Sequence, residues 1–290
     1  MKIAVLGAGK MGTWFTKFFL EEGHSVVIAD RNKEKLSKLK TELAVETADF
    51  ADAVKGADSV LICVAISAFE DVVKLIAPSI RQGQIIMDIC SVKVVPVKVM
   101  HKHIKQGLIL GTHPVFGPGS KGIKNKAFVL TPTNPKEEKF AAELKKWLEQ
   151  RKAHVFVMSP EKHDELMSAV LGLPHFLGLV ACDVLLERED YAETKKVAGT
   201  TYRLLFTLAE VTALENPELF TSLQLGLPEI TKLETHFIEK AHEWLRLVQQ
   251  KDPTAIAQKM AQLKAKLAKA NGDYARSYEI MYKMLEAVEN

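Results

Sequence analysis

The chain has 290 residues, of which 47% are hydrophobic and 26% are charged, and its net charge is +3. This length allows two domains with well-buried cores, and the composition is ordinary for a soluble globular protein. A net charge this small, without a basic run, argues against a nucleic-acid-binding protein. Cys63, Cys90 and Cys182 are far apart in the sequence. We therefore expect free thiols in the cytoplasm, and neither disulfides nor a metal site.

The first predicted elements form a nucleotide-binding unit. Residues 2–6 are a short apolar strand, residues 7–12 have the pattern G-x-G-x-x-G, and a helical pattern follows. The first glycine permits a tight turn, the second lets the backbone approach a pyrophosphate, and the third lets the helix pack closely on the strand. The free N–H groups at the start of that helix would face the anion. The predicted cofactor-binding residues of the loop are Gly7, Gly9, Lys10, Met11 and Gly12.

A second predicted strand, residues 25–29, ends at Asp30. An acidic side chain at this place can accept hydrogen bonds from the ribose hydroxyls of NAD, and it would repel the 2′-phosphate of NADP. Arg31 could bind that phosphate if Asp30 turned away. We therefore expect NAD as the cofactor, with NADP as the alternative.

Strands and helices alternate up to residue 157. Further strands are expected at 58–64, 84–88, 108–111, 126–130 and 154–157, and helices at 33–43, 68–80 and 136–150. Short apolar runs separated by helices indicate a doubly wound parallel sheet, so the fold class is α/β and residues 1–158 are expected to form a Rossmann domain. Ligands of such sheets bind at the carboxyl ends of the strands. The stretches after Met87 and after Leu110 should therefore face the nicotinamide.

Residues 159–290 contain no convincing strand, and we expect a second, all-helical domain. Its helices are predicted at 160–186, 192–214, 217–225, 229–250, 253–270 and 273–288. The apolar content exceeds what one layer of helices would bury, which predicts a homodimer formed through this domain.

One apolar stretch, residues 166–186, is long enough to cross a membrane. It contains Pro174 and His175 at its centre, and its flanks lack the basic residues expected on a cytoplasmic side. A helix that is apolar all round is also typical of the centre of a helical domain. We therefore predict a buried helix and no membrane contact.

Two stretches at strand ends carry candidate catalytic groups. Ser91 and Lys93 follow the strand at 84–88, although Ser91 could simply cap a helix and Lys93 could be solvated. His113 ends the next strand in a rigid loop of prolines and glycines. A histidine there has a pKa suited to accepting a proton, and its position favours catalysis over a core histidine.

The helical domain offers two further candidates. Pro174 should kink its helix, and the kink can direct His175 toward a ligand. Arg203 stands among apolar helix positions and needs an anion or access to water. His163 and the other histidines carry no supporting pattern.

Taken together, these residues make the chain similar to the prephenate/arogenate dehydrogenase family of tyrosine biosynthesis, and especially to archaeal members. The resemblance covers nearly the whole length. It is carried by Ser91-Val92-Lys93, the loop 113–118, Lys162-His163-Asp164, Pro174-His175-Phe176, Tyr202-Arg203-Leu204, the stretch 216–220 and the region Gly272-Asp273-Tyr274.

The resemblance implies an NAD-dependent oxidative decarboxylation of prephenate or arogenate. It makes His113 the proton acceptor of the 4-hydroxyl group, with Ser91 hydrogen-bonded to it, and it assigns substrate binding to His175, Lys93 and Arg203. Many members carry a second arginine two turns after Arg203, where this chain has Val211. Another cation must substitute there, or the substrate differs.

Two other functions remain open at this point. A 3-hydroxyacid dehydrogenase would resemble the chain up to about residue 80, but it would use a lysine where Pro174-His175 stands. A non-catalytic NAD-binding redox sensor would keep the glycine loop and Asp30, without needing Ser91 and His113.

Overall fold

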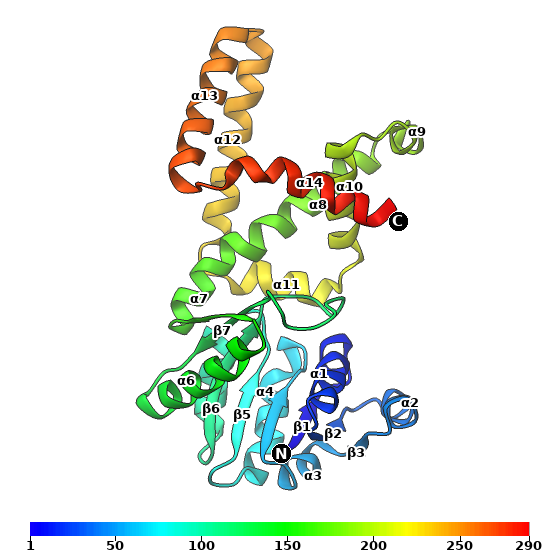
Figure 1. Ribbon diagram of the computed structural model, residues 1–290, viewed down its shortest axis with the longest axis vertical. Coiled ribbons are helices and arrows are strands. Elements are labelled where there is room, and N and C mark those ends of the chain that lie inside the picture. The colour runs from blue at the N-terminus through cyan, green and yellow to red at the C-terminus, as the bar shows by residue number, and fades with distance from the viewer. Residues whose placement is uncertain (290) are drawn as a thin grey trace. The chain divides into compact units, whose positions relative to one another are not determined.

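The computed structural model describes residues 1–289 and divides into two compact units (Figure 1). The first unit comprises Met1–Ser168 and Pro217–Pro228, and the second comprises Ala169–Asn216 and Glu229–Asn290. The boundary predicted at residue 158 precedes this division. The return of residues 217–228 to the first unit was not predicted.

The first unit is built on one eight-stranded sheet with the strand order β3-β2-β1-β4-β5-β6-β7-β8. The strands are β1 (Lys2–Leu6), β2 (Ser25–Ala29), β3 (Glu46–Ala48), β4 (Ser59–Ile62), β5 (Ile85–Asp88), β6 (Leu108–Pro114), β7 (Ala127–Thr131) and β8 (His154–Val157). All neighbouring strands are parallel except β6 and β7, which are antiparallel. The doubly wound parallel sheet predicted from the sequence thus contains one antiparallel pair, which was not predicted. No helix separates β6 from β7, and a parallel return needs a crossover connection.

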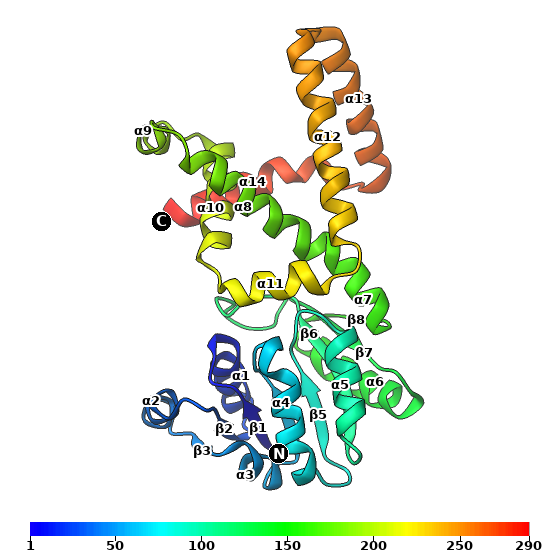
Figure 2. The same cartoon turned by 180° about the vertical axis from the view of Figure 1, so that it is seen from behind.

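Helices cover both faces of the sheet (Figures 1 and 2). The helices of this unit are α1 (Lys10–Glu21), α2 (Lys33–Leu43), α3 (Phe50–Lys55), α4 (Ile66–Ile76), α5 (Val94–His103), α6 (Pro135–Gln150), α7 (Pro160–Met167) and α11 (Pro217–Gly226). One apolar core includes Phe69 of α4 and Met100 of α5, and the other includes Phe15 of α1 and Leu148 of α6. The predicted α/β class is confirmed, and the carboxyl ends of the parallel strands β1 to β6 lie at one edge of the sheet.

The described part of the second unit is entirely helical. Its elements are the π-helical turn η2 (Ser168–Gly172), which crosses the boundary between the units, α8 (Leu173–Leu186), α9 (Tyr191–Lys196), α10 (Thr200–Leu214), α12 (Ile230–Gln250), α13 (Pro253–Ala270), the short turn η3 (Tyr274–Arg276) and α14 (Ser277–Glu289). The single helix predicted at 192–214 is in fact two, because the chain leaves the helix after Lys196 and α10 starts from the extended residue Gly199.

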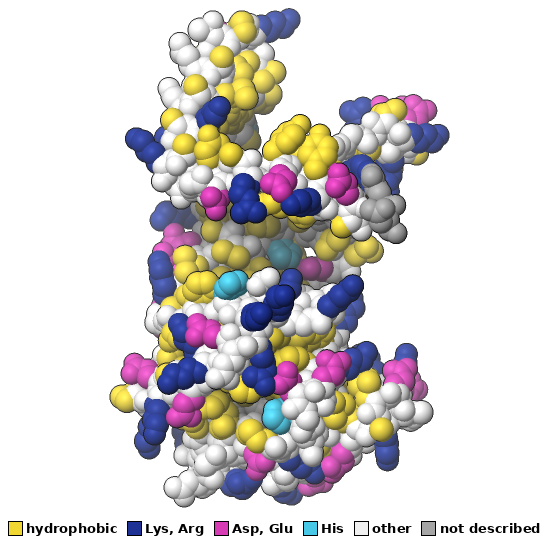
Figure 3. Space-filling model, viewed as in Figure 1, with side chains coloured by type: hydrophobic (Ala, Val, Ile, Leu, Met, Phe, Trp, Pro, Cys, Tyr) yellow, Lys and Arg dark blue, Asp and Glu magenta, His cyan; other side chains and the backbone are white. Residues whose placement is uncertain are grey.

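The apolar helix does not have the predicted buried environment. The continuous helical stretch Pro160–Leu186 has the length and composition of a membrane span, and only 17% of its most apolar window is buried. Val184 of α8 is 60% exposed. Exposed apolar side chains also occur on α13 and α14, among them Met260, Leu263 and Tyr278 (Figure 3). The second unit therefore has more apolar surface than one chain covers.

Candidate active site

The glycine loop joins β1 to α1, and two of its glycines are required by the backbone. Gly7 has a φ of +117°, and a Cβ atom on it would lie 2.6 Å from the carbonyl oxygen of Cys63. A Cβ atom on Gly12 would lie 1.9 Å from the carbonyl oxygen of Gly7. Gly9 differs, because no atom would lie within 4 Å of its Cβ. The loop thus packs tightly at both ends and leaves open space in front of its middle glycine, which a pyrophosphate could fill.

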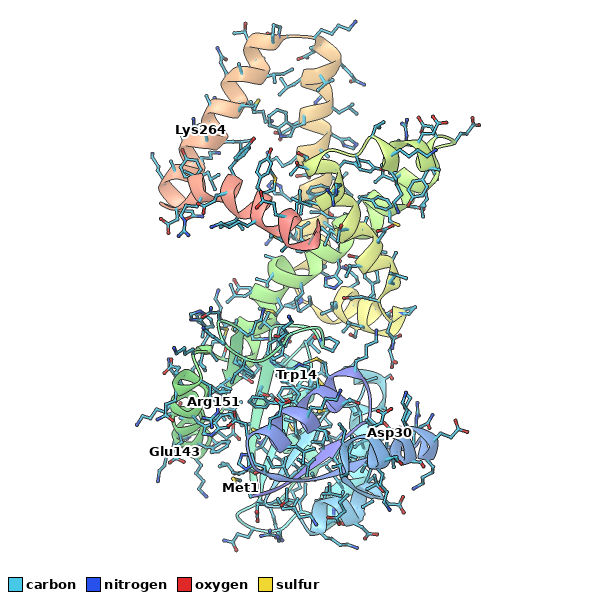
Figure 4. The ribbon with its side chains drawn as sticks, turned by 45° about the vertical axis from the view of Figure 1, so that its right-hand side comes forward. Met1, Trp14, Asp30, Glu143, Arg151 and Lys264 are labelled. Atoms are coloured by element: carbon cyan, nitrogen blue, oxygen red, sulfur yellow. The ribbon has the colours of Figure 1, made fainter. Side chains whose placement is uncertain are left out.

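Asp30, at the carboxyl end of β2, is tied to this loop (Figure 4). Its Oδ2 accepts a hydrogen bond from the N–H of Ala8 at 2.6 Å, and its Oδ1 accepts one from the N–H of Asn32 at 2.8 Å. A carboxylate has further lone pairs, so Asp30 can still accept hydrogen bonds from ribose hydroxyls. Arg31 beside it is exposed. Helix α1 starts at Lys10 with no side-chain cap and no acidic residue in its first turn, an arrangement that favours an anion.

His113 lies near the carboxyl end of β6, and its side chain is buried. Its Nδ1 is 2.8 Å from Nε2 of His163, which belongs to α7. Nδ1 of His163 is 2.7 Å from Oδ1 of Asp164. The backbone N–H groups of Lys93 and Val94 donate to the two oxygens of Asp164, at 2.7 and 2.9 Å. A carboxylate, two imidazoles and the start of α5 therefore form one hydrogen-bonded chain.

Burial dominates the electrostatics of the two histidines. It holds the pKa of His113 well below its ordinary value, and the neighbouring His163 and Lys93 lower it further. Burial also lowers the pKa of His163, although the hydrogen bond to Asp164 works in the opposite direction. Both rings are therefore neutral at neutral pH, and His113 is able to accept a proton.

Lys93 occupies a position different from the one predicted for a substrate ligand. Its side chain is fully buried, and its Nζ donates to the carboxylate of Asp88 and, at 2.6 Å, to the carbonyl oxygen of Thr112. Asp88 also accepts hydrogen bonds from the N–H groups of Cys90 and Thr112. These contacts connect the carboxyl ends of β5 and β6, so Lys93 holds the site together and does not present its ammonium group to a ligand.

Ser91 lies half-buried in the turn between β5 and α5. Among the described residues, no hydrogen bond joins it to His113, whose Nδ1 is occupied by His163. The motif Lys162-His163-Asp164 contributes to the family resemblance, but the contact of His163 with His113, fifty positions away, was not predicted. The adjacent Asp164 is consistent with this role, because a carboxylate bonded to one ring nitrogen orients an imidazole.

The remaining candidates belong to the second unit. On α8, His175 has its Nδ1 2.6 Å from the carbonyl oxygen of Leu171 and its Nε2 3.1 Å from a carboxylate oxygen of Glu215. On α10, Arg203 lines a pocket together with Lys195, Tyr202 and Glu210. Val211 of the same helix is 52% exposed. The second unit therefore offers one cluster around His175 and another around Arg203.

Both parts of the chain are similar to known proteins. The model of the prephenate dehydrogenase nucleotide-binding domain matches residues 15–157, and that of the prephenate dehydrogenase dimerization domain matches residues 159–262. A probable arogenate/prephenate dehydrogenase of Methanocaldococcus jannaschii is 33% identical over 250 residues, which are 85% of this chain and 56% of that protein. The cyclohexadienyl dehydrogenase of Zymomonas mobilis is 27% identical over 66% of this chain and 68% of its own length.

Solved structures have the same fold. Prephenate dehydrogenase from A. aeolicus in complex with hydroxyphenyl propionate and NAD⁺ has a TM-score of 0.76 and 21% identity, covering 93% of this chain and 98% of its own. Synechocystis arogenate dehydrogenase has a TM-score of 0.71 and 19% identity, covering 93% and 100%. Because models of both domains match in order along 15–157 and 159–262, the chain belongs to the prephenate dehydrogenase family, as its sequence motifs predicted.

Proposed function

We propose that the chain catalyses the oxidative decarboxylation of prephenate to 4-hydroxyphenylpyruvate with NAD⁺ as the oxidant. The observation that carries this proposal is His113, a buried neutral imidazole at a strand end of the nucleotide-binding unit, held through one ring nitrogen. A positioned base with these properties suits removal of a proton from a hydroxyl group. The similarity to prephenate, arogenate and cyclohexadienyl dehydrogenases supports the same chemistry.

The residues of the first unit fit NAD⁺. The open space at Gly9 leaves room for the pyrophosphate, and the uncapped start of α1 supplies free N–H groups. Asp30 is held by Ala8 in a position from which it disfavours a 2′-phosphate. A higher kcat/KM with NADP⁺ than with NAD⁺ would contradict this preference.

When bound, NAD⁺ supplies the acceptor for the hydride that leaves C4 of the substrate. His113 accepts the proton of the 4-hydroxyl group as that hydride departs, and Ser91 orients the hydroxyl. The ring then loses CO₂, and the electron pair of the broken C–C bond completes the aromatic ring. The proton on His113 returns to the phenolate oxygen, so the base is regenerated. General-base catalysis of this kind contributes about 10²–10⁴-fold.

We assign the carboxylates of the substrate to His175 and Arg203 of the second unit. Arogenate is the second candidate substrate, and two features of this chain favour it. Where many family members have an arginine, this chain has Val211, and His175 has Glu215 as its partner. An ammonium group in place of a keto group would suit this carboxylate better. The chain spans only 56% of the length of the M. jannaschii relative.

A two-by-two assay tests the proposal. Prephenate and arogenate are each offered with NAD⁺ and with NADP⁺, and formation of reduced nicotinamide is followed. We expect the highest kcat/KM for prephenate with NAD⁺. His113→Asn should lower kcat by about 10²–10⁴-fold and leave the Kd for NAD⁺ unchanged. Absence of turnover in all four combinations would refute the proposed activity, and NAD⁺ binding without turnover would favour a redox sensor.

We also propose that the enzyme is a cytoplasmic homodimer. The exposed apolar side chains of α8, α13 and α14 support association through the second unit, and the matching family model is described as a dimerization domain. The three free cysteines suit a reducing compartment.

A further inference from the structure

The donor and acceptor of each hydrogen bond between Asp164, His163 and His113 can be assigned by starting from Asp164. The two oxygens of Asp164 already accept the backbone N–H groups of Lys93 and Val94, so this carboxylate acts as an acceptor. Nδ1 of His163, 2.7 Å away, must therefore be the donor. A neutral imidazole carries a single N–H group, so Nε2 of His163 has only a lone pair to offer.

The same reasoning extends to the second ring. Nδ1 of His113 lies 2.8 Å from the lone pair on Nε2 of His163, and a hydrogen bond there requires the proton on Nδ1 of His113. The lone pair of His113 is then on Nε2. The tautomer of a histidine is set in this way by the hydrogen bond of its other nitrogen.

We propose that His163 and Asp164 are positioning residues that fix His113 as the Nδ1–H tautomer, so that its Nε2 is the base for the substrate hydroxyl. The catalytic part of this inference rests on the proposed function, but the tautomer does not. When Nε2 takes up a proton, His113 becomes an imidazolium, and its hydrogen bond to His163 becomes charge-assisted and therefore stronger. The proton then leaves Nε2 again for the phenolate oxygen, and His163 and Asp164 keep their own protonation states.

The charged groups around the pair explain why such support is needed. Lys93, at the start of α5, lowers the proton affinity of both rings, although its ammonium group is paired with Asp88 of β5. Burial opposes a positive charge on His113 as well. Asp164 of α7 is the negative group in direct contact with the pair, and it acts on His113 through His163. Without this contact, a protonated His113 would be a buried cation with no anionic support.

The first test needs neither cofactor nor substrate. In protein labelled with ¹⁵N-histidine at pH 7.5, the chemical shifts of His113 should show a protonated Nδ1 and an unprotonated Nε2. In His163→Phe, which cannot accept a hydrogen bond, the Nε2–H tautomer should become populated. His163→Gln, whose amide oxygen can accept, should retain more of the Nδ1–H tautomer. A wild-type His113 protonated at Nε2 would overturn the proposal, even if no variant folded.

The second test is kinetic. His163→Phe should lower kcat with the active substrate by about 10²-fold, within the range of a general base, and KM should change much less. The acid limb of the kcat–pH profile should move, and His163→Gln should recover part of the activity. His236→Gln on α12, whose ring is exposed, is the matched control and should match wild type. An unchanged kcat and pH profile in His163→Phe would refute the positioning role. Absence of wild-type turnover would refute the proposed function alone, because the NMR result stands independently.

Discussion

Lys93 and Asp88 form an ion pair in which both side chains are completely buried. Removing one partner of such a pair leaves an uncompensated charge in the protein interior. We therefore expect Lys93→Met to lower the free energy of unfolding by about 3–5 kcal/mol in urea denaturation. Lys162→Met is the control, because Lys162 and Glu165 are about half exposed and such a pair contributes about 0–1 kcal/mol. A stable Lys93→Met protein with only a raised KM would show instead that Lys93 binds substrate.

The two buried histidines predict a dependence of stability on pH. Folding lowers the pKa values of His113 and His163, so below about pH 6.5, the ordinary value, the unfolded chain binds more protons than the folded one. The contribution of the two histidines to the free energy of unfolding should therefore be fully present above pH 6.5. It should fall as the pH decreases toward their pKa values in the folded protein, by up to about 1.4 kcal/mol per pH unit for each histidine. Urea denaturation between pH 7.5 and 5.5 measures this slope. His163→Gln should reduce this slope by about the contribution of one histidine. An equal slope in the wild-type protein and the variant would contradict a lowered pKa of His163.

Single residues were predictable where their position along the chain determined their place in the fold. His113 was found because it ends a strand, and Asp30 because it ends the second strand of a glycine-loop unit. The burial of Lys93 was not predicted, because a lysine that follows a strand usually reaches water. Nothing in the sequence indicated that Lys93 and Asp88 would form a buried ion pair. The role of His163 depends on a contact between α7 and β6, which no local pattern encodes.

Two glycines of the loop between β1 and α1 should respond differently to substitution by alanine. Gly9 has a φ of −72° and open space around it, so Gly9→Ala should fold with a stability within about 0.5 kcal/mol of wild type. The new methyl group would stand where the pyrophosphate is expected, and the Kd for NAD⁺ should rise at least tenfold, as isothermal titration calorimetry would measure. In Gly12→Ala the methyl group meets the backbone of Gly7, and overpacking should cost about 1–3 kcal/mol of stability. Unchanged NAD⁺ affinity in Gly9→Ala would place the pyrophosphate elsewhere.

Elements were predictable to the extent that they carry their own periodicity. The longer apolar strands and most helices were found, but the six-residue helix α3 and the strand β3 were not predicted, and the three residues of β3, Glu46 to Ala48, contain no apolar run. The antiparallel direction of β7 follows from a connection without a helix, and this could have been inferred. The break between α9 and α10 and the return of α11 to the first unit were not predicted, and the return reflects long-range packing beyond a local pattern.

At the scale of the whole molecule, the second unit has apolar surface to cover. Val180, Val184 and Leu186 of α8 are 42%, 60% and 56% exposed in the single chain. Either a second copy of the chain or a lipid bilayer could cover a helix of this length and composition. His175 and Asp183 lie within the same helical stretch, and His175 is engaged with Glu215. A partner protein surface accommodates such polar groups more readily than hydrocarbon does, so a homodimer is the better explanation.

Val184→Asp tests this explanation. Because Val184 is 60% exposed, the charge should leave the fold of the single chain intact, yet it would be buried without a partner in a dimer interface. A loss of about 2 kcal/mol or more, the size of an interface hot spot, raises the dimer Kd by about 30-fold, which sedimentation equilibrium would detect. Lys146→Asp on α6, an exposed position of the first unit, introduces the same side chain and should leave the dimer unchanged. A wild-type chain that stays monomeric at every concentration, or that sediments with phosphatidylcholine vesicles, would rule out the homodimer as the cover of α8.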